Sequence, residues 1–376
     1  MTYFNILTPA LILDSNKLDT NIDRMTNRFK SLGVNLRPHL KTSKAIDVAR
    51  RAVAGNFGGI TVSTFREVEY FAQNGLSDMT LAACIAPARL NQAAAFRAKR
   101  IDLKILIDHP SVAHAIANHS GEHRVLIEMD CGEHRTGVTP GSSKLMEIAN
   151  ILNAAPNVKI AGVLTHAGHS YRCRTADEMA DIADQERNTV VDAANSLRAA
   201  GMECPIVSVG STPTALYARH LTGVTEARPG VYMFGDLFQA GIGSCTMDDI
   251  ALTVLATVIA HQENENQLLI DAGGLALSKD RSTSVLEDDC AFGLVCDVKT
   301  GNVIDGLKVA TVHQEHGQIS SSSIINFSKY PIGTQFRIMT NHSCITASGY
   351  DRYNVIDGTH PHPAAEINVW KRCNGW

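Results

Sequence analysis

The stretch Lys159-Ile-Ala-Gly-Val-Leu-Thr-His166, together with the residues that follow it, decides the fold class. It is a short apolar run, which predicts a buried strand. The capping box Thr175-Ala-Asp-Glu178 then opens a long amphipathic segment that ends at Gly201, as expected of a helix. Pro205-Ile-Val-Ser-Val209 is a second β-rich run. A strand, a helix and a strand in this order predict a parallel β-α-β unit.

The same alternation runs through the first two-thirds of the chain. We expect eight strands, at residues 35–41, 59–63, 78–82, 103–107, 124–130, 159–166, 205–209 and 223–227. Eight consecutive units favour an α/β fold of the (β/α)8 barrel type over an open doubly wound sheet. A further run, 10–14, precedes the first helix and cannot be one of the eight.

The pattern changes after about residue 240. Runs at 250–260, 267–271, 309–314 and 336–341 predict strands separated by polar turns, without a long helix between them. We therefore expect a barrel domain over residues 1–240 and a second, C-terminal all-β domain over residues 241–376. The early residues 8–14 are a candidate strand of this all-β domain.

Composition narrows the class of function. The chain has 376 residues, 44% hydrophobic and 19% charged, with a net charge of −4. These values suit a globular protein and exclude a basic surface for nucleic acid or an anionic membrane. The longest mostly apolar run, 250–260, is too short to span a bilayer, and no secretory signal is visible. Nine cysteines without a C-x-x-C motif favour reduced thiols and a cytoplasmic location.

In a barrel of this type, functional groups lie at the carboxyl ends of the strands. Lys41 ends the first run, within Arg37-Pro-His-Leu-Lys41-Thr-Ser-Lys44. A partly desolvated lysine there can act as an amine nucleophile toward a carbonyl, although most lysines are solvated surface charges. His166 ends the sixth run, and Arg228-Pro-Gly230 follows the eighth.

Gly210, Ser211 and Thr212 follow the seventh run and precede a helix. Glycine permits a close backbone approach, the two hydroxyls can donate, and the first turn of a helix offers N–H groups to an anion. Loops after strands seven and eight commonly bind phosphate in barrels. An ordinary Ser/Thr helix cap is the alternative, but the position favours a phosphate site.

His342-Ser-Cys344 lies in the all-β part. If the last strand continues through it, the imidazole and the thiol face the same side, and both are good ligands for zinc-class metals. The pattern is short, so a core cysteine beside an exposed histidine is the alternative. His316, in Gln314-Glu-His-Gly317, is a further histidine in a loop context, where a functional and a structural role are both open.

Together these residues resemble the alanine-racemase-like, fold-type III enzymes that use pyridoxal 5′-phosphate (PLP). The resemblance is to the metal-dependent D-serine dehydratase and D-threo-3-hydroxyaspartate dehydratase branch. It rests on the Lys41 and His316 motifs above and on His166-Ala-Gly-His-Ser-Tyr171, Ser208-Val-Gly-Ser-Thr-Pro-Thr214 and Asn341-His-Ser-Cys344. D-threonine and D-3-hydroxyaspartate aldolases are similar but usually carry His-x-Asp in place of His342-Ser-Cys344, which favours a dehydratase.

The resemblance implies a role for each of these residues. Lys41 would hold the cofactor as a Schiff base and act as general base, with His316 as a second catalytic candidate. His342 and Cys344 would bind a divalent metal, zinc first, with cobalt or manganese as other options. Tyr171 and Arg228 are alternative partners of the ring nitrogen. The cofactor contacts implied besides Lys41 are His166, Tyr171, Gly210, Ser211, Thr212, Arg228, Gly230 and Tyr232.

The implied reaction is elimination from a D-β-hydroxy amino acid by a homodimer. The expected substrates are D-threo-3-hydroxyaspartate, giving oxaloacetate and ammonia, and D-serine, giving pyruvate and ammonia. Lys279 and Arg281 are candidate partners for the second carboxylate of hydroxyaspartate. The alternative is a surface loop in which Asp280 offsets one of these cations.

Three other functions stay open: an aldolase, an amino-acid racemase and a non-catalytic PLP-binding protein. Aldehyde plus glycine as products would identify an aldolase. The His342-Cys344 pair argues against a racemase, and the all-β domain argues against the non-catalytic protein.

Overall fold

The computed structural model describes residues 5–357 and 367–376. The chain divides into two compact units, residues 24–230 with 375–376, and residues 1–23 with 231–374. The division near residue 230 falls ten residues before the boundary expected from the sequence.

The unit formed by residues 24–230 contains an eight-stranded parallel sheet in the order β2-β9-β8-β7-β6-β5-β4-β3. Its strands are β2 (Asn35–Leu36), β3 (Ile60–Val62), β4 (Asp78–Cys84), β5 (Asp102–Ile107), β6 (His123–Met129), β7 (Val158–Thr165), β8 (Ile206–Val209) and β9 (Glu226–Ala227). The two ends of this order meet, because the Leu40 N–H donates to the Thr61 carbonyl and the Thr61 N–H donates to the Pro38 carbonyl, both at 2.9 Å. The predicted (β/α)8 class is confirmed.

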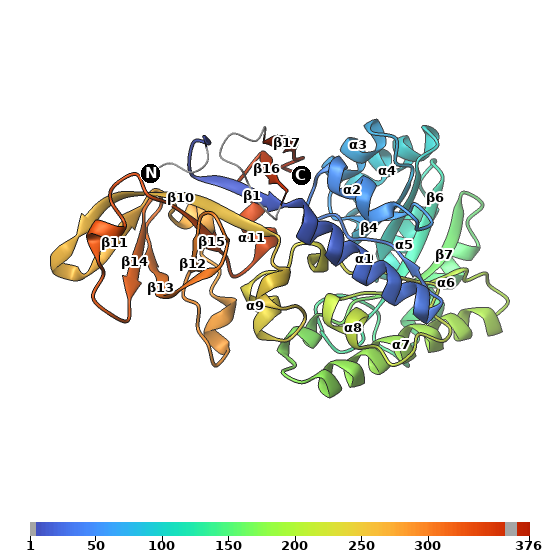
Figure 1. Cartoon of the computed structure of the whole chain (residues 1–376). Coiled ribbons are helices and arrows are strands. Elements are labelled where there is room, and N and C mark those ends of the chain that lie inside the picture. The colour runs from blue at the N-terminus through green and yellow to red at the C-terminus, as the bar shows by residue number, and fades with distance from the viewer. Residues whose placement is uncertain (1–4, 358–366) are drawn as a thin grey trace. The chain divides into compact units, whose positions relative to one another are not determined.

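Helices alternate with these strands (Figure 1). They are α1 (Ser15–Leu32), α2 (Ile46–Val53), α3 (Phe65–Gln73), α4 (Leu90–Ala98), α5 (Pro110–Ala117), α6 (Lys144–Asn153), α7 (Ala176–Ala199) and α8 (Thr212–Tyr217). The Thr175–Glu178 capping box predicted for α7 is present, with the Thr175 hydroxyl accepting from the Glu178 N–H. No helix in the described part of the chain is both long enough and apolar enough to cross a membrane.

The barrel interior is apolar in its middle and ionic at its amino end. Leu106, Leu126, Ala161 and Leu164 form one buried cluster. At the amino end, the buried Arg37 pairs with Glu226 and Asp78, both at 2.8 Å. Such ion pairs fill this end of the barrel, so the carboxyl ends of the strands are left for a site.

The second unit contains a nine-stranded sheet in the order β11-β14-β13-β12-β15-β10-β1-β16-β17. Because β11 also pairs with β10, six of these strands close into a barrel. The strands are β1 (Ala10–Asp14), β10 (Leu252–Gln262), β11 (Gln267–Ile270), β12 (Leu294–Asp297), β13 (Val303–Val312), β14 (Gly317–Ser321), β15 (Gln335–Met339), β16 (Arg352–Ile356) and β17 (Asn368–Lys371).

The early strand β1 belongs to this second sheet, where it pairs antiparallel with β10 and parallel with β16. The short helices α9 (Leu237–Gly241), α10 (Gly274–Leu277) and α11 (Ser343–Ser348) lie between its strands in sequence. The strands β12, β14, β16 and β17 escaped the sequence analysis, since each is only four or five residues long and carries no clear alternation.

Candidate active site

Lys41 lies in a turn that follows β2, so the strand predicted over residues 35–41 is too long. The ladder of β2 ends at Leu36, and an isolated bridge joins His39 to Thr61 before the chain turns. Pro38 has no N–H and cannot continue a regular ladder, which explains the early end. The Lys41 side chain is exposed at the carboxyl end of the barrel, and its charge acts on the imidazoles of His39 and His166.

These two imidazoles are neutral near pH 7. Burial, opposed by the hydrogen bond to the Gly210 carbonyl and assisted by the charge of Lys41, lowers the pKa of His166 to about 3. Burial and the same lysine lower the pKa of His39 well below its ordinary value. The hydrogen bond to Gly210 is made by Nδ1 of His166, so the proton of the neutral ring lies on that nitrogen. The structure therefore brings Lys41 together with two uncharged imidazoles, those of His39 and His166.

The loop after β8, residues 210–212, forms a candidate phosphate cradle. The Ser211 hydroxyl accepts from the Thr214 N–H at 3.2 Å and lies 2.9 Å from the hydroxyl of Ser170. The Thr212 hydroxyl is buried and has no hydrogen-bond partner among the described residues. A Cβ on Gly210 would lie 2.9 Å from the backbone nitrogen of Arg228. The glycine therefore lets the loop after β8 pack against Arg228, and the spare Thr212 hydroxyl at the start of α8 fits a bound phosphate group.

Gly230, after β9, brings a second loop against the lysine turn. A Cβ there would lie 2.7 Å from the carbonyl oxygen of His39 and 3.4 Å from the Thr42 hydroxyl. Any larger residue would push the two loops apart. Gly230 thus sets the distance between the loop after β9 and the turn that carries Lys41.

Glu186, which the sequence analysis missed, connects two loops of the mouth from α7. Its Oε1 accepts from the Ala167 N–H at 3.0 Å and the Gly210 N–H at 2.9 Å, and its Oε2 accepts from the Thr214 hydroxyl at 2.7 Å. Burial raises the pKa of this carboxyl, and the hydrogen bond from Gly210 opposes the shift. One signal could have found it, because Glu186 shares the buried face of α7 with Met179, Ala183 and Val190.

Arg228 makes its hydrogen bonds to residues of the barrel strands β7 and β8. Its guanidinium donates to the Ser208 hydroxyl at 2.6 Å and to the carbonyls of Val209 and Thr165 at 2.8 and 2.7 Å. Its Nε is buried without a partner among the described residues, and burial lowers the pKa of Arg228 to about 10. Three of its five N–H donors are used in these hydrogen bonds, and two remain.

The two candidate tyrosines differ in their surroundings. Tyr171 is half-buried in the 3-10 helix Gly168–Arg172, which follows β7. Tyr232, in the 3-10 helix Val231–Met233, is buried and its hydroxyl has no partner within the described ranges. Burial raises the pKa of Tyr232, so its hydroxyl is a neutral donor at pH 7.

His342 and Cys344 come together in the second unit, although not as a strand. β15 ends at Met339, His342 is the N-cap of α11, and Cys344 lies in the first turn of that helix. The last strand does not continue through this motif, so the two side chains do not meet by sharing the face of a strand. After β15 the backbone carbonyls of Thr340 and Asn341 accept from the Leu237 and Phe238 N–H groups, at 3.1 and 3.3 Å, instead of continuing the ladder. The side-chain amide of Asn341 donates to the carbonyls of Asp280 and Ala291, at 2.8 and 2.6 Å. The two side chains still meet, since a hydrogen bond joins His342 to Cys344.

Two carboxylates accompany this pair. Oδ2 of Asp280 lies 3.4 Å from Nδ1 of His342, and Asp236 acts on the same imidazole through its charge. Burial alone would lower the pKa of His342, but the hydrogen bonds to Asp280 and Cys344 raise it to about 11. The hydrogen bond from His342 lowers the pKa of Asp280 to about 2. An imidazole and a thiol with negative charge around them form a donor set that suits a zinc-class divalent metal.

The sequence analysis predicted three further site residues in this unit, namely Lys279, Arg281 and His316. Arg281 pairs with Asp289 at 2.6 Å and its guanidinium carbon lies 5.0 Å from the Phe292 ring centroid. Lys279 is exposed and has no ion pair within the described residues. Asp280 turns toward His342, so the alternative in which it offsets a neighbouring cation is not observed. His316 is exposed in the turn between β13 and β14.

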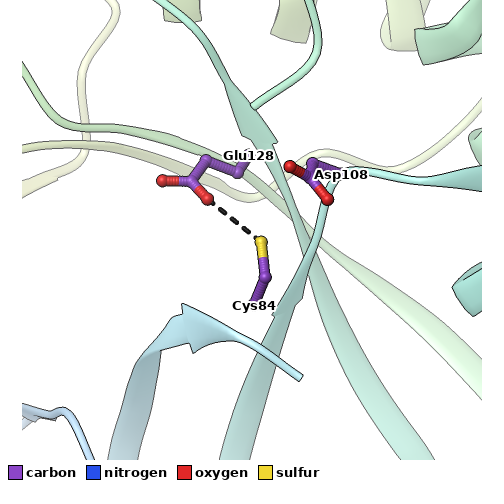
Figure 2. Close-up of side chains that lie close together, drawn as sticks. All are labelled: Cys84, Asp108 and Glu128. Atoms are coloured by element: carbon purple, nitrogen blue, oxygen red, sulfur yellow. Dashed lines mark hydrogen bonds between the residues drawn. The ribbon is translucent and has the colours of Figure 1, made fainter. Parts of the chain in front are cut away.

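A separate cluster lies at the carboxyl ends of β4, β5 and β6, where Cys84, Asp108 and Glu128 bring possible metal-ligand atoms within 4.8 Å of one another (Figure 2). The Cys84 thiol donates to Glu128 at 3.1 Å, and Asp108 accepts from the Gly137 N–H at 2.9 Å. Burial, followed by the neighbouring Glu128 charge, raises the pKa of the Cys84 thiol. The thiol therefore stays protonated. Hydrogen bonds hold the side chains of this cluster in place.

Two protein-family models match the chain. The alanine racemase N-terminal domain matches residues 13–237, and the putative serine dehydratase domain matches residues 251–356. The chain belongs to the alanine-racemase-like, fold-type III family, in the branch that carries the serine dehydratase domain. PLP is the cofactor that fits this family.

Individual relatives refine the comparison. D-threo-3-hydroxyaspartate dehydratase of Delftia sp. (strain HT23) is 40% identical over 385 residues, covering 100% of this chain and 99% of that protein. D-serine dehydratase of Dictyostelium discoideum is 34% identical, covering 99% and 98%. A solved structure of the Delftia enzyme matches with a TM-score of 0.95 over 100% of both chains. D-threonine aldolase from Filomicrobium marinum, at 23% identity and a TM-score of 0.82, shares the fold.

Proposed function

We propose that this protein is a PLP- and divalent-metal-dependent dehydratase of D-β-hydroxy amino acids. D-threo-3-hydroxyaspartate is the first substrate and D-serine the second, and the products are a 2-oxo acid and ammonia. The observation that carries the proposal is the His342–Cys344 pair with its two carboxylates, in a chain whose barrel mouth presents Lys41. The names of the most similar relatives support the same reaction.

The barrel mouth fits PLP. The Thr212 hydroxyl and the Gly210 and Gly230 backbones would hold the phosphate, and Lys41 is the amine for the Schiff base. When bound, PLP supplies an electron sink at the substrate Cα, and a divalent metal supplies a Lewis acid for the β-hydroxyl. Arg228 spends most of its donors on the barrel wall, which supports Tyr171 as the partner of the ring nitrogen.

Lys41 is the general base that takes the proton from Cα. The neutral His39 and His166 add no further positive charge beside it, and the Gly210 carbonyl keeps the His166 ring in one tautomer. His342 and Cys344 hold the metal, with zinc first and cobalt or manganese as alternatives. A cysteine-to-alanine mutant of a D-threo-3-hydroxyaspartate dehydratase has been solved in a metal-free form, which supports a metal in this branch. His316 remains a second catalytic candidate.

The remaining proposals concern the assembly and its location. All nine cysteines are thiols rather than disulfides, which supports a cytoplasmic protein. The family resemblance supports a homodimer.

Product analysis tests the function directly. We expect D-threo-3-hydroxyaspartate and D-serine to release ammonia and 2-oxo acid in equal amounts, and prolonged chelation to stop the release without removing the visible absorption of the cofactor. Lys41→Ala should lose both turnover and borohydride labelling, whereas Lys44, three residues further on and paired with Glu67, should not be labelled. Aldehyde and glycine as products would identify an aldolase. Turnover that is indifferent to chelation would remove the metal from the mechanism.

A further inference from the structure

A buried carboxylate holds the residue between the two proposed metal ligands. Asp236 caps α9, with Oδ1 accepting from the Gln239 N–H at 2.8 Å. Its Oδ2 accepts from the Ser343 N–H at 3.0 Å and lies 3.4 Å from the Ser343 hydroxyl. The residue is only 2% exposed. One side chain thus connects α9 to the middle of the His342-Ser-Cys344 motif.

The first turn of α9 adds two backbone hydrogen bonds to the same segment. The N–H groups of Leu237 and Phe238 donate to the carbonyls of Thr340 and Asn341, at 3.1 and 3.3 Å. The first N–H groups of a helix have no partner inside it, so this segment satisfies two donors that the helix cannot. From the other side, Asp280 contacts Nδ1 of His342. The backbone and the imidazole of the motif are therefore held by different carboxylates.

A capping role alone does not explain an aspartate at this place. Serine or threonine caps a helix about as well as aspartate does, without a buried negative charge. Burying a carboxylate is costly unless a cation compensates it, and Asp236 makes no ion pair with lysine or arginine in the described part of the chain; the positive charge that acts on it is that of the His342 imidazole, itself a proposed metal ligand. A divalent cation on His342 and Cys344 would provide that compensation.

We propose that Asp236 is the positioning residue of the metal site, holding residues 342–344 so that the imidazole and the thiol meet on one ion. The inference rests on the proposed metal site at His342 and Cys344. Carboxylates that orient metal ligands without touching the metal typically change metal affinity by about 10–100-fold when they are removed.

Two variants distinguish a role of Asp236 in positioning residues 342–344 from a role that is limited to capping α9. Asp236→Ser keeps an acceptor for the Gln239 N–H but is too short to hold Ser343. Asp236→Asn keeps the size but turns an NH2 group toward one of the two N–H donors. Ser343→Ala is the matched control, because it removes the longer hydroxyl contact and keeps the backbone N–H. Each protein, with its PLP, is stripped of metal and titrated with Zn²⁺ against a competing chelator. Co²⁺ is then added to read the thiolate-to-metal absorption band.

We expect both Asp236 variants to bind Zn²⁺ about 10–100-fold more weakly and to show a shifted or weakened cobalt band. Ser343→Ala should bind like the parent, and the cofactor absorption and thermal midpoint of Asp236→Ser should stay close to the parent values. Parent-like affinity and spectrum in both Asp236 variants would overturn the inference. His342→Ala and Cys344→Ala distinguish this failure from a failure of the proposed function. If those variants also bind Zn²⁺ like the parent, the metal site itself is wrong.

Discussion

At the scale of single residues, the barrel mouth depends on histidines that stay neutral. Burial lowers the pKa of His166 to about 3, whereas a histidine in an unfolded chain titrates near pH 6.5. Between these two values the unfolded chain binds a proton that the folded protein does not. The contribution of His166 to stability is therefore complete above pH 6.5 and is lost as the pH falls toward 3.

We expect the free energy of unfolding of the parent to fall more steeply between pH 7 and 5 than that of His166→Gln. The difference in slope should be roughly 1 kcal/mol per pH unit below pH 6.5. Urea unfolding followed by circular dichroism at several pH values measures it. His114→Gln, at an exposed position, is the control and should keep the parental slope. Equal slopes in the parent and His166→Gln would mean that His166 titrates normally.

Substrate choice is argued at the same scale, from the loop that carries Lys279 and Arg281. Arg281 is already paired with Asp289, so Lys279 is the cation available for the second carboxylate of hydroxyaspartate. A charged hydrogen bond contributes roughly 1.5–3 kcal/mol, so Lys279→Ala should lower kcat/KM for hydroxyaspartate about 10- to 100-fold. D-serine, which lacks that carboxylate, should change little.

Arg281→Ala is the matched comparison, because it removes a cation two residues away. We expect it to affect both substrates less than Lys279→Ala affects hydroxyaspartate. Equal losses for D-serine and hydroxyaspartate in the Lys279 variant would show that this loop does not set specificity.

At the scale of elements, α7 stabilises the active-site loops through the hydrogen bonds of Glu186. Glu186 accepts hydrogen bonds from the loops after β7 and β8, which carry His166 and the proposed phosphate cradle. Removing the carboxylate leaves three donors without their acceptor, at a cost of about 1–3 kcal/mol for each buried group. The cradle should therefore loosen without a change in any residue that touches the cofactor.

We expect Glu186→Ala to weaken PLP binding about tenfold or more, measured by dialysis and cofactor absorption. Glu186→Gln should be milder, because its amide oxygen still accepts from Ala167 and Gly210. Asp192→Ala, at an exposed position of the same helix, is the control. Cofactor affinity at the parental level in Glu186→Ala would contradict this role.

At the scale of the whole molecule, the second unit exposes apolar side chains on short helices, among them α11, which carries the proposed metal ligand Cys344. Leu275, Val285 and Ile345 are 61%, 68% and 47% exposed. Leu275 belongs to α10 and Ile345 to α11, two helices that contact each other. Large exposed apolar residues close together often mark an interface between proteins.

We expect a homodimer that Leu275→Asp weakens, seen as a shift toward monomer in sedimentation velocity. Ile324→Asp is the control, since Ile324 is 91% exposed and lies outside these helices. A fully active monomer at the assay concentration would contradict the expected assembly.

Local patterns were sufficient for the barrel and for part of its site. Alternating strand and helix signals predicted the eight strands, because each β-α unit carries its own apolar run and capping residues. The rule that sites lie at the carboxyl ends of strands then selected Lys41, His166 and the loop at Gly210. The motif at His342 was visible as a pair of ligand types, and the family resemblance supplied the chemistry.

Only the tertiary structure decided how these residues are held. Glu186, Asp236 and Asp280 act on residues that are 24, 107 and 62 positions away in the chain. For Asp236 and Asp280, nothing in the local sequence distinguishes a buried acceptor from a solvated carboxylate, whereas Glu186 lies on the buried face of α7. For the same reason the sequence left open whether the last strand continues through His342. In the structure the carbonyls of Thr340 and Asn341 accept from α9 instead. The sequence by itself determined the strands and helices of the barrel and the reactive groups, because these follow from local periodicity and residue chemistry. Their orientation came from contacts that exist only once the chain has folded.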